Sequence, residues 1–221
     1  MDKTTKIGKK RWVEVIPARK LIGVFGGSGS GKSTLTKMLS RKIPNSKVMT
    51  LDPYMHKHWE EHKGEILKAI NVNADDNVWW RNYISQNPIA IKKSIDIIGG
   101  DIEKDIDDFV KENKDASAII LDWAFIPYIS AFRKCDYTIC TDSDKRLKIK
   151  RLITRLRANN RLHDWPLSAL IARVDNSALN NLGYRAKYTV DNSGTLQDLD
   201  RKVDEILARE NTSNRFMEAE R

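Results

Sequence analysis

Residues 26–33, with the sequence GGSGSGKS, constrain the fold of this chain more than any other segment. They match the pattern G-x-x-x-x-G-K-[S/T] at every fixed position. A short apolar run at 21–25 precedes them, and a segment with helical spacing, 33–43, follows and ends before Pro44. Glycines let backbone N–H groups turn toward phosphate oxygens, and a helix N-terminus adds partial positive charge. The segment therefore predicts a phosphate-binding loop between a strand and a helix.

Short apolar runs separated by helical patterns continue along the chain. We expect strands at 21–25, 48–51, 118–121, 136–141 and 188–190. Helical patterns cover 33–43, 59–70, 78–86, 88–98, 102–111, 166–182 and 195–208, and a basic helix begins near Ser143. This alternation predicts an α/β fold, a five-stranded parallel sheet flanked by helices, of the P-loop NTP hydrolase type. Ligands of such sheets bind beyond the carboxyl ends of the strands.

The loop residues have distinct expected contacts with ATP and Mg²⁺. Lys32 is expected to reach the β- and γ-phosphates, Ser33 to ligate Mg²⁺, and Thr34 to contact the α-phosphate. The expected nucleotide-binding residues of the loop are Gly27, Ser28, Gly29, Ser30, Gly31, Lys32, Ser33 and Thr34. The alternative is a glycine-rich turn without a ligand.

Two carboxylates directly follow or end predicted strands. Asp122 ends the most apolar run, Ala118–Leu121, which is the position of an acid that holds Mg²⁺ beside a phosphate-binding loop. Asp52 follows the second strand, where a carboxylate can accept the proton of an attacking hydroxyl. The alternative for Asp52 is a helix cap, because Pro53 suits a first helical position.

Positive charge is concentrated near the middle of the chain. The net charge is +9, and residues 145–161 hold eight Lys or Arg and no acid. Arg151 and Arg155 lie four residues apart, on one helix face, where they can close over the phosphates of ATP. The alternatives are a solvated helix face and a site for a nucleic-acid backbone.

A competing motif lies between the second strand and the following helices. The segment His58–His62 fits H-x-x-E-H, a zinc-protease pattern, and helical spacing places both histidines on one face. No third ligand can be identified in the sequence, and an exposed polar helix gives the same letters. We therefore favour a helix without zinc.

Composition gives the domain organisation and the expected compartment. The 221 residues fit one domain, divided into a basic extension (1–18), a kinase domain (19–210) and a polar tail (211–221). Within the domain we expect a helical acceptor-binding insertion (53–116) and a small lid (151–182). No apolar run is long enough to span a membrane. Cys135 and Cys140 have no partner pattern and indicate reduced thiols, so we expect a cytoplasmic protein without a disulfide.

Over residues 20–207 the chain resembles the dephospho-CoA kinase family. The loop GGSGSGKST is similar to that family's GGIGSGKST, and Asp52 matches the second acid of its Asp-Ala-Asp motif. The segment NPIAIKKSIDIIGGDIEKDI resembles the helix around the family's His-Pro pair. The strand that ends in Asp122 resembles the family's Asp-x-Pro-Leu-Leu segment. Residues 150–155 are similar to its lid helix, with the R-x-x-x-R pair kept. Residues 190–196, VDNSGTL, resemble its ending beside the adenine, which implies that Asn192 binds nucleotide.

The departures from this family fall on the acceptor side. Thr50 replaces the first acid of Asp-Ala-Asp, and Gly99-Gly100 replaces the His-Pro pair. Ala124 and Tyr128 replace a proline and an acid beyond Asp122, and Ala186-Lys187 replaces an Ala-Asp pair.

The resemblance implies a kinase of coenzyme A biosynthesis that uses ATP and Mg²⁺. The implied acceptor is the 3′-hydroxyl of dephospho-CoA or a related nucleotide-like hydroxyl, with Asp52 as base and Lys32, Arg151 and Arg155 at the phosphates. The alternatives are a nucleoside or nucleotide kinase, and a non-catalytic nucleotide-binding module with a nucleic-acid or protein partner. The sequence leaves the oligomeric state open.

Overall fold

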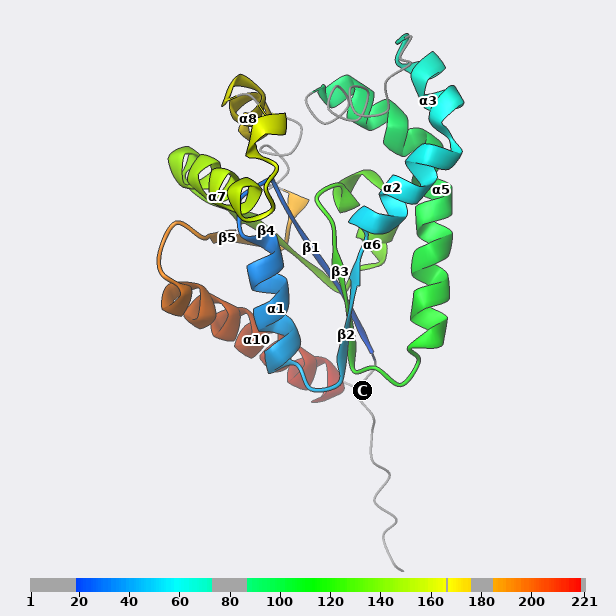
Figure 1. The fold of residues 1–221 in the computed structure, drawn as a ribbon. Coiled ribbons are helices and arrows are strands. Elements are labelled where there is room, and N and C mark those ends of the chain that lie inside the picture. Colours follow the sequence, from blue (N-terminus) through cyan, green and yellow to red (C-terminus); the bar gives the residue numbers. More distant parts are fainter. Residues whose placement is uncertain (1–18, 73–86, 166, 176–184, 220–221) are drawn as a thin grey trace, which may run out of the picture.

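The computed structural model describes residues 19–72, 87–165, 167–175 and 185–219 (Figure 1). Its sheet has five parallel strands in the order β2-β3-β1-β4-β5. These are β1 (Lys20–Gly26), β2 (Ser46–Thr50), β3 (Ala118–Asp122), β4 (Tyr137–Asp142) and β5 (Tyr188–Asp191). The predicted α/β fold with a five-stranded parallel sheet is confirmed, and every predicted strand is present near its expected position.

Helices cover both faces of the sheet, as Figure 1 shows. On one face lie α1 (Lys32–Lys42) and α10 (Leu196–Ala219), packed over a core that includes Ile22, Val24 and Val203. On the other lie α2 (Asp52–Glu61), α3 (Lys63–Ala69), α5 (Pro88–Glu112) and the short α6 (Ala131–Lys134). Their core includes Phe25 and Leu121. Neighbouring residues of one strand serve different cores because side chains alternate across a strand.

The remaining described elements lie along the carboxyl edge of the sheet. The basic helix is α7 (Lys145–Ala158), and α8 (Leu167–Val174) packs against it. Two 3₁₀ turns, Ile126–Tyr128 and Leu162–Asp164, follow β3 and α7. No helix within the described residues is both long and apolar enough to cross a membrane.

Several helix predictions are wrong in their boundaries. The helix predicted at 59–70 begins at Asp52, because Pro53 is favourable in a first turn, and it divides into α2 and α3 at His62. The helices predicted at 88–98 and 102–111 are one helix, α5, which continues through Gly99 and Gly100. A helical glycine costs only about 1 kcal/mol relative to alanine, and the buried stripe of α5 continues on both sides of the pair.

Side-chain hydrogen bonds cap the starts of two helices. Asn87 accepts hydrogen bonds from the backbone N–H groups of Ile89 and Ala90 at the start of α5. Thr195 and Asp198 form a reciprocal capping box at the start of α10. The last helix extends past the predicted end at 208 to Ala219. The helix predicted at 78–86 and the end of the one predicted at 166–182 lie outside the described residues.

Candidate active site

The glycine-rich loop joins β1 to α1 and depends on two glycines with positive φ. Gly29 has φ +80° and Gly31 has φ +93°, a region that L side chains rarely adopt. A Cβ on Gly29 would lie 2.6 Å from the carbonyl oxygen of Lys148, and one on Gly31 would overlap the side-chain amide of Asn192. Both glycines are therefore required by backbone conformation and by the close approach of α7 and the end of β5.

Polar contacts hold the loop against the neighbouring strands. The hydroxyls of Ser30 and Thr141 lie 2.8 Å apart, and both side chains are buried. The Asn192 amide donates to the carbonyl oxygen of Ser30 over 2.9 Å. Arg151 donates to the carbonyl oxygens of Gly29 and Asn192 over 3.3 and 3.0 Å. Asn192 and Arg151 thus lie at the loop, where the sequence placed them, and both help to fix its shape.

Lys32 and Asp122 form an ion pair at the carboxyl edge of the sheet. Parallel pairing of β1 with β3 sets Val24 opposite Asp122, so the carboxylate lies beside the loop. Asp122 is only 3% exposed, and burying a carboxylate without a partner would be costly. Lys32, which is expected to bind the β- and γ-phosphates, therefore also compensates the charge of Asp122, the expected Mg²⁺ ligand.

Asp52 is the first residue of α2, and its side chain is exposed beside the loop. The N-cap residue of this helix is Leu51, and no side-chain cap hydrogen bond is formed. The alternative of a helix cap for Asp52 is therefore wrong. A carboxylate that is not committed to the helix start is available to accept a proton from a bound molecule.

A single cavity of about 820 Å³ connects the loop with Asp52. Its polar wall contains most of the predicted site: Gly27, Ser28, Gly29, Gly31, Lys32, Ser33, Thr34, Asp52, Arg151, Arg155 and Asn192. Ser30 and Asp122 do not line it, since both side chains are buried. Its less polar wall consists of Met55, His56, Trp59, Ala124, Phe125 and Trp165. Ala124, one of the departures from the dephospho-CoA kinase pattern, is thus a wall residue.

Arg173 on α8 is a site residue that the sequence did not indicate. Its Nε donates to the Ser28 hydroxyl over 2.9 Å, and its guanidinium lies 5.1 Å from the centre of the Trp165 ring. Burial lowers its pKa, Arg155 lowers that pKa further, and Asp52 opposes both effects. A lone arginine in the apolar segment Leu167–Val174 is the signal that could have revealed it.

The two histidines of the H-x-x-E-H segment bind separate aspartates of α5. His58 Nε2 lies 2.6 Å from Asp105 and His62 Nε2 lies 2.9 Å from Asp101. No group of three or more metal-binding side chains occurs within the described residues. The segment thus joins α2 and α3 to α5. Because α2 begins at Asp52 and carries Trp59, these pairs also hold one wall of the cavity.

The two cysteines are free thiols. Burial raises the pKa of Cys135 to about 12 and that of Cys140 to about 11. Both thiols are therefore protonated near neutral pH, which makes them poor nucleophiles.

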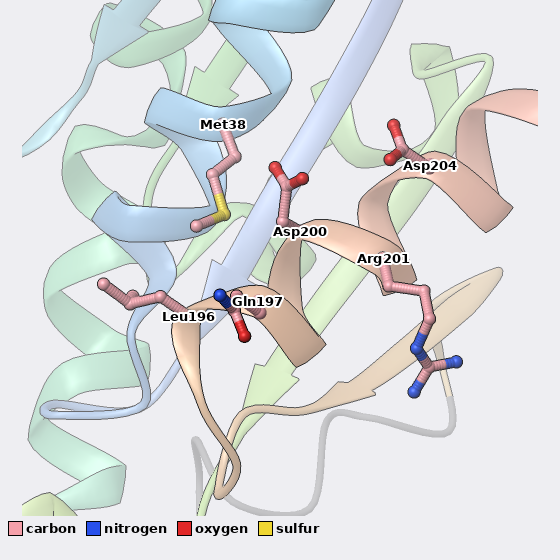
Figure 2. A pocket seen from close by; sticks show the side chains of 6 residues that line it. All are labelled: Met38, Leu196, Gln197, Asp200, Arg201 and Asp204. Atoms are coloured by element: carbon pink, nitrogen blue, oxygen red, sulfur yellow. The ribbon is translucent and has the colours of Figure 1, made fainter.

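A second, smaller hollow lies between α1 and α10, with a volume of about 390 Å³ (Figure 2). Met38 and Leu196 give it an apolar floor, and Asp200 and Asp204 lie at its rim. Both carboxylates are paired with Lys42, at 3.0 and 2.7 Å. The hollow is therefore a packing groove between two helices, bordered by charges that already have partners.

The fold and the site define a P-loop nucleotide-binding protein. Residues 14–166, more than half of the chain, match the model of the ABC transporter family. The chain therefore belongs to this family of P-loop proteins.

Solved structures show the same fold. The protein TT1252 from Thermus thermophilus is 18% identical, with a TM-score of 0.63 over 86% of this chain and 97% of that one. Shikimate kinase from Bacteroides thetaiotaomicron is 15% identical, with a TM-score of 0.51 over 86% and 98% of the two chains. Dephospho-CoA kinase from Campylobacter jejuni is 17% identical over 86% of this chain and 97% of that one, but its TM-score of 0.44 is too low to support any conclusion about this chain. No curated protein matches the sequence.

Proposed function

We propose that the protein transfers the γ-phosphate of ATP to a hydroxyl group of a small molecule. The observation that carries this proposal is the continuity of one cavity from the glycine-rich loop to Asp52 and an aromatic wall. An enzyme that only hydrolyses ATP needs room for water beyond the γ-phosphate. A compartment lined by Trp59, Phe125 and Trp165 instead suits an organic acceptor, because aromatic side chains bury large apolar areas.

In this proposal the loop and its arginines hold the donor. Backbone N–H groups of the loop and the start of α1 bind the phosphates, and Lys32 moves from Asp122 to the β- and γ-phosphate oxygens. Arg155 and Arg173 stabilise the charge that develops on the transferred group. Arg151 keeps the loop in its binding conformation through Gly29.

The proposed metal ligands are Ser33 and Asp122. Both offer hard oxygen donors, which Mg²⁺ prefers, and phosphates of the substrate normally complete its coordination. The ion, when bound with ATP, neutralises charge on the β- and γ-phosphate oxygens. Release of Lys32 from Asp122 frees one carboxylate oxygen for this role.

Asp52 is the proposed base. It accepts the proton of the attacking hydroxyl, whose oxygen forms a bond to the γ-phosphorus while the bond to the β-γ bridging oxygen breaks. ADP leaves with the electron pair of the broken bond. Replacing Asp52 by Asn keeps the size and removes the basic oxygen, so kcat should fall by about 10²–10⁴-fold with ATP affinity nearly unchanged.

Our proposed acceptor is the 3′-hydroxyl of dephospho-CoA or a related nucleotide-like molecule. The support is the segment resemblance over residues 20–207, together with a cavity wall that combines aromatic rings with Arg155 and Arg173. A nucleoside or another nucleotide is the second acceptor class, since Ala124 alters this wall. Coupled-assay ATP consumption with a panel of these acceptors tests the proposal, and stimulation by none of them would overturn it.

The match to the ABC transporter family favours a second function, ATP hydrolysis coupled to a partner. Hydrolysis releases inorganic phosphate whether or not an organic hydroxyl is present. The two functions therefore differ in one readout, which is the destination of the γ-phosphate. Lys32→Ala should abolish either reaction, whereas Asp52→Asn should selectively abolish transfer to an acceptor.

A further inference from the structure

Apart from Lys145 and Lys148, which pair with Asp175 and Asp142, the cations of α7 lie on two sides of the helix. Arg151 and Arg155 line the nucleotide cavity. Arg146, Lys150 and Arg157 are exposed. With 3.6 residues per turn, these three lie together on the side of the helix that faces away from Arg151 and Arg155. ATP in the cavity therefore cannot account for them. We refer to Arg146, Lys150 and Arg157 as the outer α7 face.

The charge of the outer α7 face is not compensated. Residues 145–161 contain no acid, and none of these three side chains has an ion-pair partner among the residues that the structure describes. Some exposed cations of other helices do have acidic partners. Lys92 pairs with Asp96 within α5, and Arg201 pairs with Glu205 within α10. The outer α7 face thus gathers three cations without an ion-pair partner in the described part of the chain, on a helix that lies along the outer edge of the molecule (Figure 1).

We propose that the outer α7 face binds the phosphate backbone of a nucleic acid, independently of the ATP site. The three cations extend over 12 residues, from 146 to 157, which corresponds to about 16 Å of helix. A line of unpaired cations on this scale binds a polyanion by releasing its condensed counterions. Such contacts position a strand and give little sequence preference.

The surroundings of this face favour a nucleic acid over a membrane or a protein. The large apolar side chains that are exposed in the described part of the chain are Ile89, Leu167 and Leu196, and none is on α7. An amphipathic membrane helix buries an exposed apolar face in the lipid, and a protein interface has a desolvated apolar or aromatic centre. The outer α7 face offers charge without either feature.

The test measures binding of a fluorescein-labelled single-stranded oligonucleotide by anisotropy at several salt concentrations. With three phosphate contacts the logarithm of the affinity should fall with the logarithm of salt concentration at a slope of about −2. A triple variant, Arg146→Gln, Lys150→Gln and Arg157→Gln, should bind the oligonucleotide at least about tenfold more weakly at low salt. Its affinity should also depend much less on salt concentration. Its KM for ATP should remain that of the wild type, because none of the three lines the cavity.

A matched control removes the same charge elsewhere. Lys92→Gln, Lys111→Gln and Arg201→Gln replace exposed cations that have acidic partners, and this variant should bind the oligonucleotide like the wild type. The proposal is overturned if the outer-face variant binds as tightly as the wild type, or if both triple variants lose equally. Displacement of the oligonucleotide by ATP would also overturn it, as would binding to anionic vesicles without binding to the oligonucleotide.

Discussion

The contact between Gly31 and Asn192 allows a quantitative test of how the loop is held. Alanine at 31 must adopt φ +93°, which costs about 1–2 kcal/mol for an L residue. Its Cβ must also displace the Asn192 amide, which breaks the hydrogen bond to the Ser30 carbonyl at a cost of about 1 kcal/mol. Gly31→Ala should therefore lower the free energy of unfolding by about 2–3 kcal/mol.

Asn192→Ala removes the same hydrogen bond and leaves the Ser30 carbonyl without it, at a cost of about 1–3 kcal/mol. In the double variant this bond is lost only once, and the smaller side chain makes room for the new Cβ. The double variant should thus be about 1 kcal/mol more stable than the sum of the single effects predicts.

Urea unfolding of the four proteins measures this coupling energy, with equal m-values as a check on two-state behaviour. Gly100→Ala is the control glycine substitution, because a Cβ there meets nothing within 4 Å and the helix gains up to about 1 kcal/mol. Strictly additive effects of Gly31→Ala and Asn192→Ala would refute the proposed contact.

Three further predictions concern the walls of the cavity. Trp59→Ala should lower the free energy of unfolding by about 3–5 kcal/mol, measured in urea, because the ring is only 2% exposed. Arg173→Lys should lower kcat/KM for ATP by about tenfold, since lysine cannot reproduce the guanidinium contact with Ser28; an unchanged kcat/KM would separate Arg173 from the nucleotide. The hydrogen bond between His62 and Asp101 raises the pKa of His62 above its usual value of about 6.5. The stabilisation from this pair is complete below pH ~6.5 and is lost as pH rises through the raised pKa, so His62→Gln should flatten the dependence of stability on pH above about pH 6.5; an unaltered profile would contradict it.

The sheet was predictable because its strands are short apolar runs that the sequence separates clearly. The loop was predictable because its pattern reflects a backbone requirement, seen here in the positive φ of Gly29 and Gly31. Asp52 and Asp122 followed from one topological rule, since parallel strands bring their carboxyl ends to the same edge. Each of these inferences rests on local sequence or on a general property of parallel sheets.

The features that were not predicted depend on contacts between segments that are distant in the sequence. Gly99 and Gly100 suggested a helix break, yet Ile98 and Ile102 on either side are fully buried and keep α5 continuous. Arg173 was not predicted as a site residue because its partner Ser28 lies 145 residues earlier in the chain. The H-x-x-E-H segment gave no indication that its histidines bind acids of α5.

The destination of the γ-phosphate tests the central claim most directly. The protein is supplied with γ-¹⁸O-labelled ATP, Mg²⁺ and dephospho-CoA or another candidate acceptor, and the products are analysed by mass spectrometry. If the protein is a kinase, the labelled phosphoryl group should appear in the organic product. Asp52→Asn should then lower the amount of this product by about 10²–10⁴-fold. Label found in inorganic phosphate alone, at a rate that no acceptor in the panel changes, would contradict the account.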